Sequence, residues 1–219
     1  MSNTTELNIV YIGTPPFPDG PAITKRRRFM VDYMNDNNIS CHVLITGKTT
    51  FSGNNSQHGT YGKCDYYNIC GNNIFKYNKV GKQYLQKWFN KNKVNVLIFP
   101  TSMSYMDYFL YRYAKKLGYR IVFDIVETTF WKHERMGLKT KMQYRINNFL
   151  SEKAYKYAAA FVISERLSKE INEICPSMPV CILPNSTPIK VRSGRKNFNN
   201  PIRILYAGTY ASKEGVTYL

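Results

Sequence analysis

LNIVYIGTPPFPDGPAITKRRR, which runs from Leu7 to Arg28, carries the strongest structural signal in this sequence. An apolar run ends at Gly13, a segment rich in proline and glycine follows, and a helical pattern begins after Pro21. We therefore predict a strand, a loop and a helix in that order. The carboxyl end of a parallel strand borders the crevice where ligands bind, and a helix that starts there points unpaired N–H groups and partial positive charge at it. The arrangement predicts a site for an anion such as a phosphate.

The loop of this unit has two interpretations. Gly20 lets the backbone come close to a ligand, and Pro21 suits a first helical position because it has no N–H to lose. The five proline and glycine residues between Pro15 and Pro21 are also typical of a stiff surface turn. Both interpretations stay open on these residues alone.

Length and composition limit the class of protein. The 219 residues are 43% hydrophobic, as expected for a globular chain with a sizeable core. No apolar run is long enough to cross a bilayer and the first six residues are polar apart from Met1, so we expect no secretory signal and a cytosolic location. The five cysteines form no CxxC pair, which predicts reduced, mostly buried thiols and no metal site.

The charge is strongly positive. With 31 Lys and Arg against 14 Asp and Glu, the formal net charge is +17, which favours nucleic acid, anionic lipid headgroups or phosphorylated small molecules as partners. Four of these cations, Lys25 to Arg28, fall in the first turns of the predicted helix, where they oppose the helix dipole. A bound anion would relieve that conflict.

Strand and helix patterns alternate along the chain and predict an α/β, Rossmann-like parallel sheet with helices on both faces. The predicted strands after the first are Cys41–Thr46, Tyr66–Cys70, Val94–Phe99, Arg120–Val126, Ala159–Ile163 and Val180–Leu183. The predicted helices cover roughly residues 23–38, 76–93, 104–117 and 138–157, and Ser164 caps a further short helix that bears Leu167 and Ile171. We predict one domain over 1–185, a linker over 186–201, and the first strand of a second α/β unit over 202–219.

Two further features of the sequence each have two interpretations. Val80, Tyr84 and Trp88 belong to an apolar stripe framed by lysines, which suits an anionic membrane surface but is more simply a helix face that packs on the sheet. Glu127 follows the strand Arg120–Val126, at the same sheet edge as Gly20. It is a candidate for catalysis or for binding a sugar hydroxyl, and equally for a surface residue that caps the next loop.

Five ordered segments resemble the successive motifs of family 4 glycosyltransferases of the GT-B fold. They are NIVYIGTPPFPDGPAITKRRR (Asn8–Arg28), IVFDIVE (Ile121–Glu127), AYKYAAAFVISERL (Ala154–Leu167), ILPN (Ile182–Asn185) and ILYAGTYASKEGVTYL (Ile204–Leu219). The resemblance identifies residues 1–185 as the N-terminal, acceptor-side domain, followed by the start of a donor-binding domain.

The resemblance implies transfer of a sugar from a nucleotide-sugar donor to a hydroxyl of a polysaccharide or glycolipid, with retention at the anomeric carbon and without a metal or other cofactor. The family often has a histidine where Glu127 stands, and Glu127 is the candidate catalytic residue. The resemblance places Asp19, Gly20 and Pro21 beside the donor phosphates, and the further candidates for donor-phosphate or cleft binding are Arg26, Asn185, Gly208 and Lys213. The implied partners are the donor, a glycan or lipid-linked acceptor and an anionic membrane surface, which would make the protein peripheral on the inner face of the cell membrane.

Three other classes of function were compared with the sequence: an interaction module, a nucleic-acid-binding protein and a dinucleotide oxidoreductase. A non-catalytic basic interaction module, truncated or completed by a partner, would fold without hydrolysing a donor. We expect no nucleic-acid binding, because no recognition helix, aromatic-rich basic repeat or zinc spacing is present. The first strand leads into no G-x-G-x-x-G, which disfavours a dinucleotide oxidoreductase. We expect these 219 residues alone not to turn over a sugar nucleotide, since the family's catalytic carboxylates lie farther along the donor domain.

Overall fold

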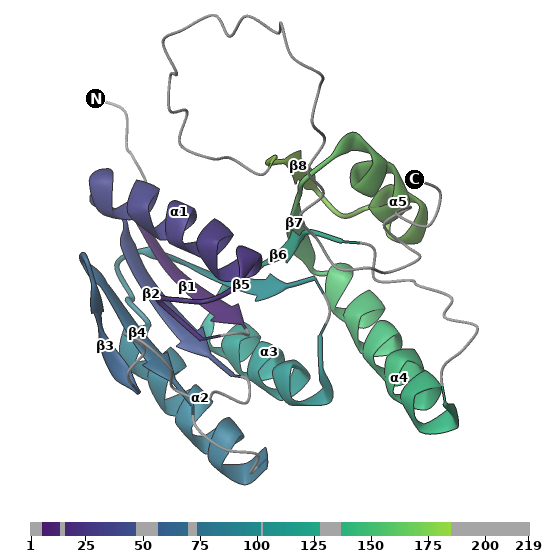
Figure 1. The fold of residues 1–219 in the computed structure, drawn as a ribbon, viewed down its shortest axis with the longest axis horizontal. Helices are drawn as coiled ribbons and strands as arrows, with labels where there is room; N and C mark the ends of the chain where they lie inside the picture. The colour runs from purple at the N-terminus through teal and green to yellow at the C-terminus, as the bar shows by residue number, and fades with distance from the viewer. Residues whose placement is uncertain are drawn as a thin grey trace, which may run out of the picture. The chain divides into compact units, whose positions relative to one another are not determined.

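The computed structural model describes residues 6–13, 16–46, 57–69, 74–101, 103–127 and 137–184, and these form one eight-stranded sheet with five helices (Figure 1). The strands are β1 (Leu7–Gly13), β2 (Ser40–Ile45), β3 (His58–Tyr61), β4 (Cys64–Asn68), β5 (Val94–Pro100), β6 (Arg120–Ile125), β7 (Ala158–Val162) and β8 (Val180–Ile182). The helices are α1 (Ala22–Asp36), α2 (Ile74–Trp88), α3 (Tyr105–Leu117), α4 (Leu138–Tyr155) and α5 (Glu165–Ile174).

The strands lie in the order β3-β4-β2-β1-β5-β6-β7-β8, and only the β3–β4 pair is antiparallel. The first strand of the chain is therefore central, between β2 and β5. Its six residues from Asn8 to Gly13 are all buried, as expected for a parallel strand covered on both faces. The predicted α/β, Rossmann-like class is confirmed.

The two faces of the sheet are covered unequally. One buried cluster joins the sheet to α1 through Val31 and Met34. The larger cluster, on the other side chains of the same strands, contains residues of α2, α3, α4 and α5, among them Leu85, Leu110 and Ile171. The packing interpretation of the 80–89 stripe is confirmed, because Leu85 and Trp88 are buried.

The third helix begins and ends where its sequence predicts. Ser104 caps α3 by accepting the Asp107 N–H, and the Asp107 carboxylate accepts the Ser104 N–H at 3.1 Å, which completes a capping box. Gly118 ends the helix in the left-handed conformation, with φ 98°, that glycine adopts without strain. The capping carboxylate is buried and also accepts the hydroxyl of Tyr77.

The region between β2 and α2 differs from prediction. Instead of one strand over Tyr66–Cys70, the structure has a hairpin in which β3 pairs with β4 and β4 pairs with β2. The buried side chains of β4 are Cys64, Tyr66 and Asn68. The predicted strand has the length of β4 but begins two residues late, and β3 was missed because its sequence, His58–Tyr61, has no apolar alternation.

Cysteine placement agrees with the predicted thiols among the residues that the structure covers. Cys41, Cys64 and Cys175 are buried and unbridged, Cys181 is exposed and unbridged, and Cys70 lies outside the described ranges. None of the described helices combines the length and apolar content that a membrane span needs. The linker and second-domain strand predicted for 186–219 also lie outside the described residues and stay predictions.

Candidate functional site

Side chains of β3 and β4 hold the loop between β1 and α1 in place. Phe17 is fully buried and contacts the rings of Tyr61 and Tyr66 edge-on. Asn68 holds the same residue by its backbone: its side-chain N–H donates to the Phe17 carbonyl oxygen at 3.1 Å, and its Oδ1 accepts the Phe17 N–H at 3.4 Å. The buried polar residue of β4 thus positions the loop that precedes α1.

Two other residues of this loop, Pro16 and Gly20, lie close to the first turn of α1. Thr24 Oγ1 donates to the Pro16 carbonyl oxygen at 3.1 Å and is buried. A Cβ on Gly20 would lie 2.5 Å from Thr24 Oγ1, so only glycine fits without a shift. Gly20 and Pro21 are themselves exposed, and Asp19 is half-buried. The predicted loop residues are therefore fixed in place with their outer surface open to solvent.

The amino end of α1 has no side-chain cap. Pro21 is the N-cap residue, it makes no side-chain hydrogen bond, and the first turn contains no acidic residue. The N–H groups of Thr24 and Lys25 bond to the Pro21 carbonyl oxygen, at 2.9 and 3.2 Å. A helix end of this kind presents N–H groups and partial positive charge to an anion.

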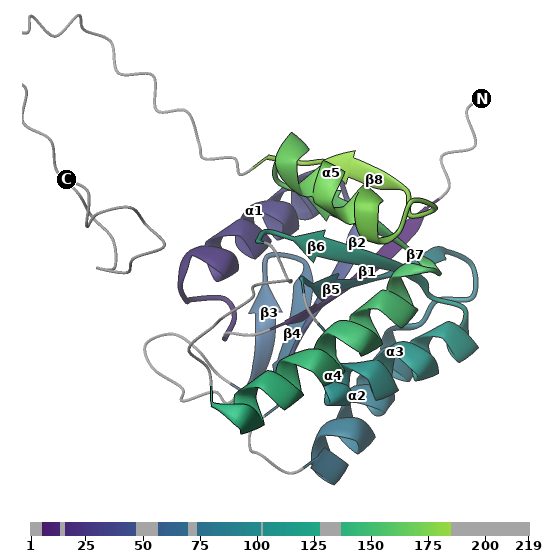
Figure 2. The ribbon, with the colours of Figure 1, turned by 90° about the vertical axis from the view of Figure 1, so that its right-hand side faces the viewer.

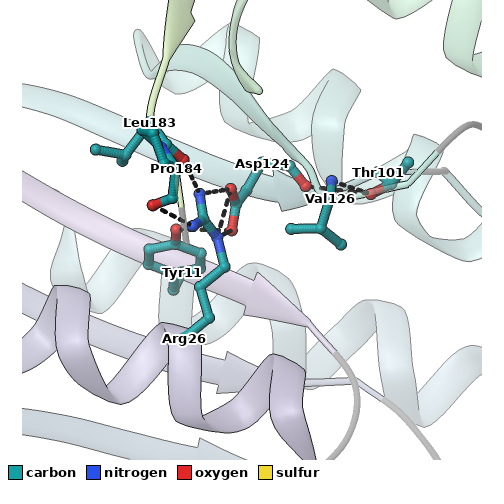
Figure 3. A network of polar contacts seen from close by, with 7 residues as sticks. All are labelled: Tyr11, Arg26, Thr101, Asp124, Val126, Leu183 and Pro184. Atoms are coloured by element: carbon teal, nitrogen blue, oxygen red, sulfur yellow. Dashed lines mark hydrogen bonds and ion pairs between the residues drawn. The ribbon is translucent and has the colours of Figure 1, made fainter. Parts of the chain in front are cut away.

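A buried ion pair lies beside this helix end and is drawn in Figure 3. Arg26 Nη2 lies 2.9 Å from Asp124 Oδ1, and Arg26 Nε donates to both carboxylate oxygens at 3.2 Å. The two side chains are 9% and 6% exposed. Arg26 also donates to the carbonyl oxygens of Leu183 and Pro184, at 3.2 and 3.4 Å. One side chain of α1 thus joins the carboxyl end of β6 to the segment that follows β8.

Asp124 is held by two further residues, its carboxylate by Tyr11 and its backbone by Thr101 (Figure 3). The Tyr11 hydroxyl donates to Asp124 Oδ2 at 3.3 Å. Burial, with the Asp124 charge second, raises the pKa of Tyr11 far above its ordinary value, so this hydroxyl keeps its proton. Thr101 Oγ1 donates to the Asp124 carbonyl oxygen at 3.3 Å and accepts the Val126 N–H at 3.1 Å, which fixes the end of β6.

The next two arginines of α1, Arg27 and Arg28, make contacts that differ from those of Arg26. Arg27 is 3% exposed, and a Cβ on Gly13 would lie 2.1 Å from its Nη2, so glycine at the end of β1 makes room for the guanidinium. Burial lowers the pKa of Arg27. Arg28 pairs with Asp19 at 3.2 Å and donates to the Tyr61 hydroxyl at 3.2 Å.

The structure brings part of the predicted site together. Asp19, Gly20, Pro21 and Arg26 lie on the loop and helix that follow β1, and Glu127 is exposed just beyond β6 at the same sheet edge. Carboxylates of this chain, Asp124 and Asp19, already neutralise two of the arginines whose charge predicts a bound anion. Asn185, Gly208 and Lys213 lie outside the described ranges, and their assignments stay predictions.

Sequence reasoning missed Tyr11, Arg27 and Asp124. Asp124 is the only charged residue inside the apolar run IVFDIV, and a charge at such a position is buried only with a partner, so its isolation was a usable signal. Tyr11 and Arg27 carried no comparable signal. Among the residues that the structure covers, no three His, Cys, Asp or Glu side chains gather as metal ligands would.

Comparison with known proteins adds little to this geometry. No protein-family model matches this chain, and no curated protein matches it. Among solved structures, a similar chain is the alpha,alpha-trehalose 6-phosphate synthase from Burkholderia multivorans, at a TM-score of 0.41 and 8% sequence identity. The alignment covers 78% of this chain and 42% of that chain, so this chain spans less than half of its length. At this similarity the comparison shows neither a family nor an activity.

Proposed function

We propose that this chain contributes the acceptor-side domain of a retaining GT-B glycosyltransferase similar to family 4. The enzyme would move a sugar from a nucleotide-sugar donor to a hydroxyl of a polysaccharide or glycolipid. The observation that carries the proposal is the uncapped amino end of α1, held at the carboxyl end of β1 by a loop with an open outer surface at Gly20 and Pro21.

The chemistry of the reaction suits this helix end. As the glycosidic bond to the donor breaks, the leaving nucleoside diphosphate gains negative charge, which N–H groups and a helix dipole stabilise. Gly20 would let the diphosphate approach the backbone, and the exposed Lys25 one turn away would add a mobile positive charge. Asp19 would not repel the diphosphate strongly, because Arg28 pairs with it.

The remaining residues have proposed roles that follow from their positions. Arg26 is a positioning residue, since its guanidinium is occupied by Asp124 and by two carbonyl oxygens. Glu127, exposed at the same edge, would accept a hydrogen bond from a sugar hydroxyl. Asn185, Gly208 and Lys213 are assigned to the donor side by the motif resemblance alone. We propose a cytoplasmic site of action, where nucleotide sugars would be available to the enzyme.

The test is a titration of the purified chain with UDP, GDP, ADP and inorganic pyrophosphate, followed by amide NMR. We expect weak binding that shifts the amide signals of Gly20, Ala22 and Ile23. Lys25→Glu should weaken it about fivefold or more, because two unit charges change near the phosphates. Lys169→Glu is the matched control, since Lys169 is an exposed lysine on α5 and belongs to neither the β1–α1 loop nor α1.

Two results would contradict the proposal. One is that no nucleoside diphosphate shifts the amides of the β1–α1 loop. The other is salt-dependent binding of DNA that sugar nucleotides do not compete, which would favour nucleic-acid binding instead.

A further inference from the structure

Among the described residues, α4 is buried against the domain in its second half and exposed in its first half. Every residue from Leu138 to Ile146 is exposed, whereas Ser151, Ala154 and Tyr155 near the end of the helix are buried. Ser151 Oγ accepts the Met103 N–H at 3.0 Å, and the Tyr155 hydroxyl donates to the Thr101 carbonyl oxygen at 2.9 Å. Figures 1 and 2 show the beginning of α4 extending away from β7, toward which its end points.

Large apolar side chains lie on the outer face of this helix. Leu138, Met142, Ile146 and Phe149 follow one another at intervals of four, four and three residues, so they share one face of α4. They are 86%, 61%, 44% and 55% exposed. We name them the α4 stripe. The same spacing places the buried Ser151, Ala154 and Tyr155 on the opposite face. This apolar spacing predicts a helix, which the structure confirms, and the apolar face of that helix is exposed.

Positive charge borders the stripe on both sides. By helical spacing, Lys139 and Lys153 lie along one side of the stripe, and Lys141 and Arg145 lie along the other. Lys153 Nζ is 4.3 Å from the centroid of the Phe149 ring, so its stem lies along the apolar surface. Glu152 is the only acidic residue in α4.

We propose that the α4 stripe docks this protein onto an anionic lipid bilayer. In a helix that lies at a membrane surface, apolar side chains enter the acyl boundary while flanking lysines and arginines reach the phosphate groups. The stripe is a single row of exposed side chains on one helix face, which suits a fluid surface better than a shaped protein partner. A second copy of this chain would bring like charges together, because the same cations border its own stripe.

The proposal concerns a different surface from the β1–α1 loop and does not depend on the transferase activity. It replaces the 80–89 stripe as the membrane-facing candidate, because Leu85 and Trp88 are buried and Val80, Tyr84 and Phe89 pack against the core. It also assigns the net charge of +17 a local use, since each Lys or Arg near an anionic bilayer strengthens binding about fivefold.

The experiment is flotation of the full chain with vesicles of phosphatidylcholine alone or mixed with phosphatidylglycerol. We expect the chain to float with the mixed vesicles and not with phosphatidylcholine alone. The double variant Met142→Asp and Phe149→Asp should reduce binding at least tenfold. The matched control is Tyr33→Asp, which alters a side chain on α1 that is 65% exposed and should leave binding unchanged.

A second pair of variants tests the charges. Lys139→Glu with Lys141→Glu should reduce binding at least tenfold, and Lys169→Glu should reduce it by less. Circular dichroism and the nucleoside-diphosphate titration report on folding and on the loop site independently, so loss of lipid binding is distinguishable from failure of the proposed transferase site.

Three outcomes would overturn the assignment. The chain fails to float with anionic vesicles, the stripe variants float as the wild type does, or sedimentation finds dimers that the stripe variants dissociate. The last outcome would make the stripe a contact between copies of this chain.

Discussion

At the scale of single residues, two ion pairs on α1 differ chiefly in burial. The Arg26–Asp124 pair is almost fully buried, whereas the Arg28 and Asp19 side chains are 40% and 43% exposed. Removing one member of a buried pair leaves an uncompensated charge, whereas an exposed pair is screened by water.

Asp124→Asn should therefore lower the free energy of unfolding by about 3 kcal/mol. Asp19→Asn, the matched control, should lower it by less than about 1 kcal/mol. Urea unfolding measures both. Equal losses in the two variants would show that burial of the first pair does not carry this stability.

A second residue-scale prediction concerns His42, whose ring stacks on Trp88 at 4.8 Å between centroids. Burial lowers the pKa of His42 to about 4; the nearby Asp65 opposes this shift, and Lys87 adds to it. The unfolded chain takes up this proton near pH 6.5 and the folded chain does not, so this contribution is complete above pH 6.5 and is lost as pH falls toward 4.

The free energy of unfolding should fall by about 3 kcal/mol over that range from this group alone. Chemical denaturation at several pH values measures it. His42→Phe keeps an aromatic ring against Trp88 and should remove this part of the pH dependence. If the variant kept the pH dependence of the wild type, His42 would not be its source.

Several residues of the candidate site could be singled out from the sequence alone. Gly20, Pro21 and Arg26 are visible because glycine, proline and clustered charge mark the start of a helix after a buried strand. The partner of Arg26 was not, because Asp124 lies 98 positions away and only the folding of the sheet brings the two together.

At the scale of elements, two serine caps offer a comparison. Ser104 accepts the Asp107 N–H and donates to the buried Asp107 carboxylate at 2.5 Å. The Ser164 hydroxyl accepts the Leu167 N–H at 3.4 Å, and α5 has no reciprocal side-chain cap among the described residues.

Ser104→Ala should thus lower the free energy of unfolding by about 2 kcal/mol, and Ser164→Ala by about 0.5 kcal/mol. Thermal or urea unfolding of both variants measures the difference. A larger loss for Ser164→Ala would contradict the importance of the reciprocal cap at α3.

The same cap explains why α3 was predictable. Its serine, its aspartate three residues later and its terminal glycine are all local signals. The hairpin of β3 and β4 was not predictable from local signals, because its buried Asn68 hydrogen-bonds to Phe17, which lies 51 positions earlier in the sequence. In α4, an apolar period predicts a helix correctly but does not say whether its apolar face meets the sheet or solvent.

At the scale of the whole molecule, the excess of positive charge acts on stability. With a net charge of +17, the folded chain repels itself more than the expanded unfolded chain does. Salt screens this repulsion.

Raising sodium chloride from low to physiological concentration should raise the melting temperature by about a few degrees at pH 7. Differential scanning fluorimetry measures it. Sucrose at equal osmolarity is the control for non-ionic effects. A melting temperature that falls with salt would mean that attractive pairs outweigh the net repulsion.

The central place of β1 has a consequence for synthesis of the chain on the ribosome. Its neighbour β2 follows within about 30 residues, but its other neighbour β5 begins at Val94. Until β5 emerges, one side of the buried strand β1 is an open edge of backbone hydrogen-bonding groups, and Asp124, the partner of Arg26, emerges later still. The nascent segment before Val94 is therefore where a holding chaperone would be most needed.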